Sequence, residues 1–245
     1  MAIAILNSGS ANKGSSGTSY TYSYNSGTTG SDRYLLVSFV EQSGGTVTGV
    51  TYAGVSMTKL VGPTLFGSTS GGNAEYIYGL LNPTTSSNNV VITCSSSAAN
   101  YFTQNWVITG TSGVLNTSHT TVGTTTSAAV SDSVTTTVDG CGVFCFAGND
   151  QNANAFSVGT KFIDNGGNAI ARTTTFPQTT AGSASFTWNF SGSSGNNASQ
   201  VVALEPVSTP SGPANLKSLD SNLKANIKSY NSNLIANIKS IDSNV

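Results

Sequence analysis

The stretch Arg33-Tyr-Leu-Leu-Val-Ser-Phe-Val-Glu41 is the clearest β-strand signal in the chain. It is rich in leucine, valine and aromatic residues, and its length falls in the usual range for a strand. Seven further runs have the same character, at residues 46–53, 74–81, 89–94, 101–109, 142–147, 184–190 and 200–204. Clusters of Gly, Ser and Asn, which form turns, stand between the runs. The pattern predicts an all-β protein.

The spacing of these runs also predicts how the strands are arranged. A dozen or more short strands without a helical period favour a jelly-roll-like two-sheet sandwich, with hairpins between successive strands. The segment from Asp32 to Leu60 reads as three strands, the last two of which meet at Ala53-Gly54. We therefore expect a three-strand meander in this segment.

Several motifs resemble a known domain family. They are Arg33-Tyr-Leu-Leu-Val-Ser-Phe-Val, Val50-Thr-Tyr-Ala-Gly-Val-Ser-Met-Thr, Tyr76-Ile-Tyr-Gly-Leu-Leu-Asn-Pro83 and Asn88-Asn-Val-Val-Ile92. They are similar to those of a jelly-roll, concanavalin-like sandwich domain of bacteriophage virion proteins and of surface-fibre proteins of environmental bacteria. The resemblance covers about residues 15 to 206 and implies fold and context, but no catalytic residues. The chain lacks the paired acidic loop that holds calcium in lectin-like relatives.

The composition of the chain excludes several classes of function. Its 245 residues contain 9 Lys and Arg, 10 Asp and Glu and a single His, which gives a net charge of −1. A surface so poor in positive charge does not favour nucleic acid as a partner. So few titratable groups supply few general acids or bases, and we expect neither an enzyme nor a cofactor.

The sequence contains no recognisable targeting segment. The N-terminus, Met1-Ala-Ile-Ala-Ile-Leu-Asn7, lacks the basic region of a signal peptide, and no apolar run approaches the length of a membrane span. We expect Met1–Asn7 to begin the first strand, with no classical signal peptide and no membrane span.

A change in composition marks a domain boundary near residue 206. The segment Glu205-Pro-Val-Ser-Thr-Pro-Ser-Gly-Pro213 is rich in proline, which stiffens the chain and removes hydrogen-bond donors. The predicted organisation is a sandwich at 1–206, a Pro-rich linker at 207–213 and a separate tail at 214–245.

The tail carries an 11-residue repeat that begins at Leu216, Ile227 and Ile238. Its main apolar positions recur at spacings of 3, 4 and 4 residues, which places them on one stripe of an α-helix. They are Leu216, Leu219, Leu223, Ile227, Tyr230, Leu234, Ile238, Ile241 and Val245. The repeat predicts a helical (hendecad) tail whose stripe is an assembly interface.

The stripe predicts self-assembly. Asn and Ser are poor helix formers, so we expect a helix only where a partner covers the apolar side chains. The tail has four Lys and two Asp, a charge of +2, whereas residues 1–213 have five basic and eight acidic side chains, a charge of −3. These features favour a homo-oligomeric structural subunit of an extracellular or virion filament, assembled head to tail. Two alternatives remain open: the stripe folds back on its own sandwich, or the tail donates a strand to a neighbour's sheet.

Four polar residues are candidates for chemistry, each with a plainer interpretation. His119 lies in a polar run with no carboxylate or nucleophile nearby in sequence, which favours a surface residue. Asp150 is the best acidic loop residue, but one carboxylate makes a poor calcium site. Glu41 and Glu75 would need to approach each other across strands to act as a glycosidase pair.

The alternative function is a carbohydrate-binding or adhesin module, with glycans as partners. It depends on whether Trp106, Trp188, Tyr76 and Tyr78 form an exposed stacking platform or fill the core, and their alternating strand positions favour the core.

The three cysteines are expected in the core rather than at a metal. Cys94, Cys141 and Cys145 have no His or further Cys at zinc spacing, so we expect small buried side chains and no metal site.

Overall fold

The computed structural model describes residues 3–13, 16–27, 32–42, 45–67, 72–122, 129–149, 160–164, 169–178, 180–189 and 196–208. Contacts divide the chain into two units, Met1–Val207 and Ser208–Val245. All strands described below belong to the first unit. The nine stripe residues and the predicted helical tail lie outside the described residues, so their conformation stays a prediction.

The described residues form sixteen strands and no helix, which confirms an all-β protein with several antiparallel sheets. Sheet A has the order β1 (Ala4–Lys13), β9 (Asn100–Thr109), β3 (Tyr34–Gln42), β7 (Asn73–Leu81), β6 (Thr58–Phe66). Sheet B has the order β2 (Gly17–Asn25), β8 (Ser87–Ala98), β4 (Val47–Tyr52), β5 (Val55–Ser56). We call sheets A and B sandwich 1.

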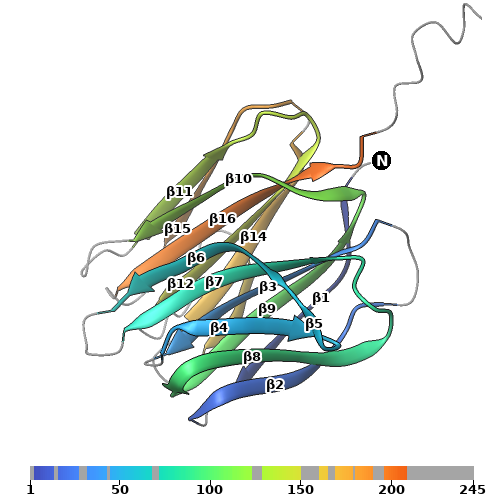
Figure 1. Cartoon of the computed structure of the whole chain (residues 1–245). Coiled ribbons are helices and arrows are strands. Elements are labelled where there is room, and N and C mark those ends of the chain that lie inside the picture. Colours follow the sequence, from blue (N-terminus) through green and yellow to red (C-terminus); the bar gives the residue numbers. More distant parts are fainter. Residues whose placement is uncertain are drawn as a thin grey trace, which may run out of the picture. The chain divides into compact units, whose positions relative to one another are not determined.

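The second half of the chain forms two more sheets. Sheet C has the order β10 (Thr111–Val122), β16 (Asn197–Pro206), β12 (Cys141–Asn149), β14 (Ala169–Gln178), β13 (Thr160–Asp164). Sheet D pairs β11 (Ala129–Thr135) with β15 (Ser183–Asn189). We call sheets C and D sandwich 2. Figure 1 shows the four sheets as successive layers, with β2, β8 and β4 at one side and β11 and β15 at the other.

Three apolar clusters fill the spaces between these layers. Sheets A and B enclose one that includes Leu35, Val37 and Phe39 of β3. Sheets C and D enclose one around Trp188. The third cluster joins sheet A to sheet C, and we call it the seam; it includes Leu36 and Trp106 from sheet A and Phe144, Phe146 and Val202 from sheet C. Sheets A and C are therefore covered on both faces.

Burial on both faces explains why residues 33–41 dominate the sequence pattern. Eight of the nine residues of β3 are buried, and alternate side chains enter the sandwich 1 core and the seam. A strand covered on both sides needs apolar residues at nearly every position, so it reads as a continuous run.

The two sandwiches repeat one strand order. Sheet A runs β1-β9-β3-β7-β6 and sheet C runs β10-β16-β12-β14-β13. Taken in chain order, the strands of sheet C therefore occupy the same places in their sheet as the strands of sheet A. The outer sheets agree as well, because β11-β15 matches β2-β8. The counterparts of β4 and β5 would fall between β12 and β13, in a part of the chain outside the described residues. The described strands of residues 4–109 and of residues 111–206 thus follow the same order.

Two sequence-based expectations about strand arrangement need correction. The body contains four sheets rather than one pair, because the seam buries a second face of sheets A and C. The segment from Asp32 to Leu60 is not a meander: β3 belongs to sheet A and β4 to sheet B, so the chain crosses between sheets after β3. The expected turn is confirmed, since Ala53 and Gly54 join the paired strands β4 and β5 with φ of 50° and 79°.

Candidate functional site

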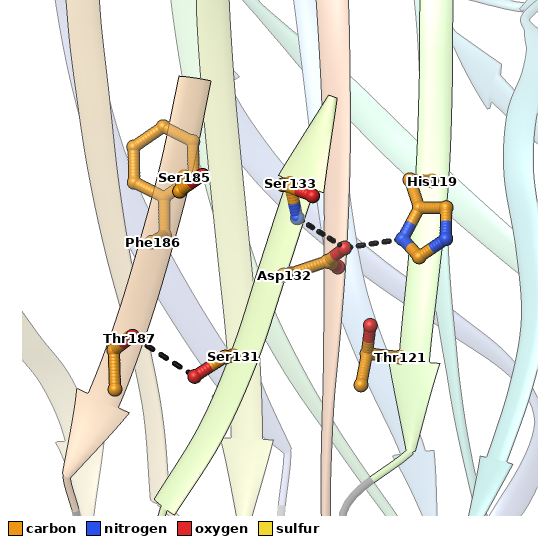
Figure 2. Close-up of a pocket in the computed structure, with 8 residues that line it drawn as sticks. All are labelled: His119, Thr121, Ser131, Asp132, Ser133, Ser185, Phe186 and Thr187. Carbon is orange, nitrogen blue, oxygen red and sulfur yellow. Dashed lines mark hydrogen bonds and ion pairs between the residues drawn. The ribbon is translucent and has the colours of Figure 1, made fainter. Parts of the chain in front are cut away.

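A polar concave site lies at one edge of sandwich 2. It is formed by β10, the edge strand of sheet C, and by the two strands of sheet D (Figure 2). His119 of β10 lies opposite Val201 of β16, which belongs to the core between sheets C and D. Directly opposed residues of an antiparallel pair point to the same face, so the imidazole points toward sheet D.

Strand β11 supplies the partner of this imidazole. Val130, Asp132 and Val134 are buried, whereas Ser131 and Ser133 between them are exposed. An aspartate therefore occupies the middle of an apolar row. A buried carboxylate needs hydrogen-bond donors, and Oδ1 of Asp132 accepts the backbone N–H of Ser133 at 2.8 Å and lies 2.5 Å from Nδ1 of His119.

The two partners differ sharply in exposure. The His119 side chain is 55% exposed and the Asp132 side chain is 0% exposed. Oδ2 of Asp132 is buried, and no hydrogen bond from a described residue reaches it. A neutral imidazole that donates its Nδ1–H to Asp132 carries its lone pair on Nε2. The carboxylate thus orients the ring, with Nε2 on the side away from Asp132.

Hydroxyl groups line the rest of the site. The hollow has a volume of about 270 Å³ and is lined, besides His119 and Asp132, by Phe186 and by five hydroxyl residues: Thr121, Ser131, Ser133, Ser185 and Thr187. The Ser131 and Thr187 hydroxyls hydrogen-bond each other at 2.9 Å across β11 and β15. The lining contains no Lys or Arg.

Sequence reasoning found one half of this pair and missed the other. The exposed position of His119 agrees with the expected surface residue. The sequence shows no carboxylate next to it, but the fold brings Asp132 to it from 13 residues away. One signal was available in Val130-Ser-Asp-Ser-Val134, where the aspartate has the inward phase of the two valines. Among the hydrogen bonds of the described residues, that to Asp132 engages Nδ1 of the His119 ring.

The glycosidase-like pairing of Glu41 and Glu75 is wrong. Glu41 shares a hollow with Tyr76 on the sandwich 1 face of sheet A. Glu75 lies on the seam face, where a Cβ on Gly148 would be 2.5 Å from its Oε1. The two carboxyl groups therefore stand on opposite faces of one sheet.

Glu75 is a buried acid in the seam. It is 0% exposed, and this burial raises its pKa well above 4.5, against a smaller lowering effect of the Gly148 backbone. The neighbouring amide of Gln200 donates to the Thr64 hydroxyl and to the Glu75 carbonyl, both at 2.8 Å. The raised pKa favours the protonated form of this carboxyl group, which belongs to the packing of the seam.

The four candidate aromatics belong to the core. Trp106 and Trp188 are 0% exposed, Tyr76 is 2% exposed and Tyr78 is 6% exposed. This confirms their core assignment and removes the aromatic platform that sugar stacking would need.

The cysteines also agree with their predicted place. Cys94, Cys141 and Cys145 are free and buried, and burial raises the pKa of Cys145 to about 12. The described ranges hold no group of three or more His, Cys, Asp or Glu that could bind a metal ion. Asp150 lies outside them, so its role as a cation ligand stays untested.

Comparison with models of known protein families and with curated proteins finds no match for this sequence. Over the described residues, no helix has the length and apolar character needed to cross a membrane.

Proposed function

We propose that the protein is a structural subunit of an extracellular or virion filament and that its copies assemble head to tail through residues 214–245. The observation that carries this proposal is the 11-residue repeat, which places nine large apolar side chains on one stripe of a helix. Such a stripe gains stability only when it leaves water, at roughly 1.5 to 3 kcal/mol for each large side chain. A second copy of the chain is a partner that is available wherever the protein is made.

The strand order of the body supports the structural assignment. In each half the chain crosses repeatedly between the inner and the outer sheet, at β1-β2-β3-β4 and β7-β8-β9 in the first half and at β10-β11-β12 and β14-β15-β16 in the second, as in a double-sheet jelly roll. We assign each half to this jelly-roll-like class. Two such sandwiches joined by a buried seam make a stiff building block, since most of the apolar side chains of the body are buried in its layers.

The body also offers an apolar surface that suits the stripe of a neighbouring copy. A hollow of about 460 Å³ is lined in part by Leu60, Leu80, Leu81 and Leu115, and Leu81 is 46% exposed. Val114, next to Leu115, is 52% exposed. Exposed apolar groups of this kind mark contact surfaces in soluble proteins. The proposed occupant is the Leu and Ile stripe of the next copy.

The repeat itself provides the test. Leu223→Asn places a polar group on the stripe, whereas Ser221→Asn changes a polar position of the same repeat. The stripe variant should sediment as single subunits while the parent and the Ser221 variant form fibres. Removal of residues 214–245 should have the same effect as Leu223→Asn. Fibres that persist without the tail would refute assembly through it.

A carbohydrate-binding or adhesin module remains the second candidate function. Burial of the aromatics removes its first support, but the hydroxyl-lined hollow beside His119 favours it. The two functions are compatible because they use different parts of the chain.

A further inference from the structure

We infer that the hollow between β10 and the β11–β15 pair binds one unit of a neutral saccharide through its exposed Ser and Thr hydroxyl groups. This inference rests on the second candidate function and is independent of filament assembly.

The charges around the hollow select the class of ligand. No Lys or Arg lines it, so a phosphate or carboxylate group would find no counter-charge. Its one carboxylate, Asp132, is buried and already bonded to His119, so a cation has no free anion to bind. Phe186 is 7% exposed and offers little apolar surface. A neutral ligand rich in hydrogen-bonding groups fits what remains.

Four of the hydroxyl groups form two cross-strand pairs on sheet D. Ser133 lies directly opposite Ser185, and Ser131 lies opposite Thr187, so two facing pairs follow one another along β11 and β15 (Figure 2). All four are exposed. Each hydroxyl both donates and accepts, and a sugar ring presents the same kind of groups at its edge. Pockets for drug-sized ligands measure about 300 to 1,000 Å³, so a hollow of about 270 Å³ suits a single sugar unit.

Asp132 is the positioning residue of the site. Figure 2 shows its carboxylate between the backbone N–H of Ser133 and the imidazole, which approaches from β10. Placing an acid between Val130 and Val134 destabilises the core unless the acid has partners. Such a local cost is typical of positions kept for a site. Here its effect is to fix the imidazole of His119 at the edge of the hollow.

Sandwich 1 provides an internal comparison. Its β2 corresponds to β11, and there the hydroxyl of Tyr22 donates to Asn105 at 2.8 Å. The burial of Tyr22 raises its pKa, and the residue belongs to the packing of sandwich 1. We therefore place one saccharide site on the described body, in sandwich 2.

The single histidine of the chain makes the test direct, because its Hε1 and Hδ2 ring protons give one set of signals that belongs to His119. The full-length protein is titrated with the methyl glycosides of glucose, galactose, mannose and N-acetylglucosamine. We expect at least one to shift the His119 signal saturably, with a millimolar dissociation constant, and inorganic phosphate and tetramethylammonium to leave it unchanged. Absence of a shift with all four glycosides, or an equal shift with phosphate, would overturn the inference.

Variants separate a built site from incidental contact. Ser185→Ala and Ser133→Ala should each weaken the glycoside about five- to tenfold, as expected for one lost hydrogen bond, measured by saturation-transfer NMR on the ligand. Ser23→Ala, an exposed hydroxyl on β2 of sandwich 1, is the matched control and should change nothing. Equal affinities in all three variants would overturn the site. Sedimentation of the Ser185 variant should match the parent, so failure of binding and failure of assembly are distinguishable.

Discussion

Sandwich 1 and sandwich 2 follow the same chain path with different core chemistry. Eight of the nine tyrosines lie between residues 20 and 101, and the sandwich 1 core contains stacked rings such as Tyr20 on Tyr101 and Phe39 on Tyr76. The sandwich 2 core has no tyrosine among its described members and is built from Val, Ala, Cys, Phe186 and Trp188. The comparison teaches that strand order depends on the inward and outward alternation, which both halves share, and tolerates different fillings of the core.

The second difference between the halves is a buried aspartate in the outer sheet of sandwich 2. Sandwich 2 carries Asp132 in a row where sandwich 1 has tyrosines, and it alone has the His119 pair. At this edge of the sandwich 2 core, an acid that is bonded to an exposed imidazole takes the place of an apolar side chain. The candidate site therefore lies in sandwich 2.

The largest expected effect comes from removing one of the two tryptophans. Trp106 fills the seam and Trp188 fills the sandwich 2 core, and a Trp→Ala change in a core costs about 3 to 5 kcal/mol. Each variant keeps one fluorophore, so urea unfolding of Trp188→Ala reports on the seam and that of Trp106→Ala on sandwich 2. If the seam couples the halves, both variants should unfold in a single transition. Two separate transitions in the parent would show that the sandwiches are independent.

The next effect concerns Glu75 in the seam and depends on pH. Its raised pKa means that the folded state keeps a proton that the unfolded chain releases above 4.5. The contribution of Glu75 to the unfolding free energy is fully present below pH 4.5. It is lost as pH rises toward the raised pKa, and the unfolding free energy then falls by up to about 1.4 kcal/mol per pH unit. Glu75→Gln, which imitates the protonated acid, should match the parent at low pH and exceed its unfolding free energy at pH 8. Parallel pH profiles of parent and variant would contradict a buried neutral acid.

Substitutions of His119 and of Asp132 should change the unfolding free energy by a smaller amount and in opposite directions. His119→Ala leaves Asp132 buried without its partner and should cost about 1 to 2 kcal/mol, less than a fully buried pair because the imidazole is half exposed. Asp132→Val completes the apolar row of β11 and should be neutral or stabilising.

The double variant sharpens this result. His119→Ala combined with Asp132→Val should recover the stability of Asp132→Val alone, because no unpaired acid remains. Chemical denaturation of the four proteins forms the cycle. A double variant as unstable as His119→Ala would show that the imidazole stabilises sandwich 2 through packing.

The smallest expected effect is at the turn between β4 and β5, a pair present in sandwich 1 without a described counterpart in sandwich 2. Ala53 has a φ of 50°, which a side chain with a Cβ adopts at a cost. Ala53→Asn creates Asn-Gly, the preferred pair for a turn with two positive φ angles. We expect a gain of roughly 0.5 to 1 kcal/mol in unfolding free energy by urea titration. A loss of stability would mean that the side chain, not the backbone, governs the turn.

Sequence patterns recovered the strands that are buried on both faces and missed several that are not. Strands β3, β9, β12 and β16 read as apolar runs because both of their faces are covered. Strands β2 and β10 are rich in Ser and Thr and have exposed positions along their length, so their polar composition resembles that of loops. In β11, Asp132 interrupts the alternation at its centre. The hydrophobic periodicity thus indicated which residues are buried more reliably than it indicated which residues form strands.

The amino-acid sequence by itself determined that this is an all-β protein with buried tryptophans and cysteines and with an apolar repeat after residue 213, because burial and periodicity are properties of neighbouring residues. Only the tertiary structure decided that the body is a repeated sandwich joined by a seam and that His119 meets Asp132. Both depend on which strands pair across long separations. Pairing depends on contacts between distant segments, and no local pattern encodes those contacts.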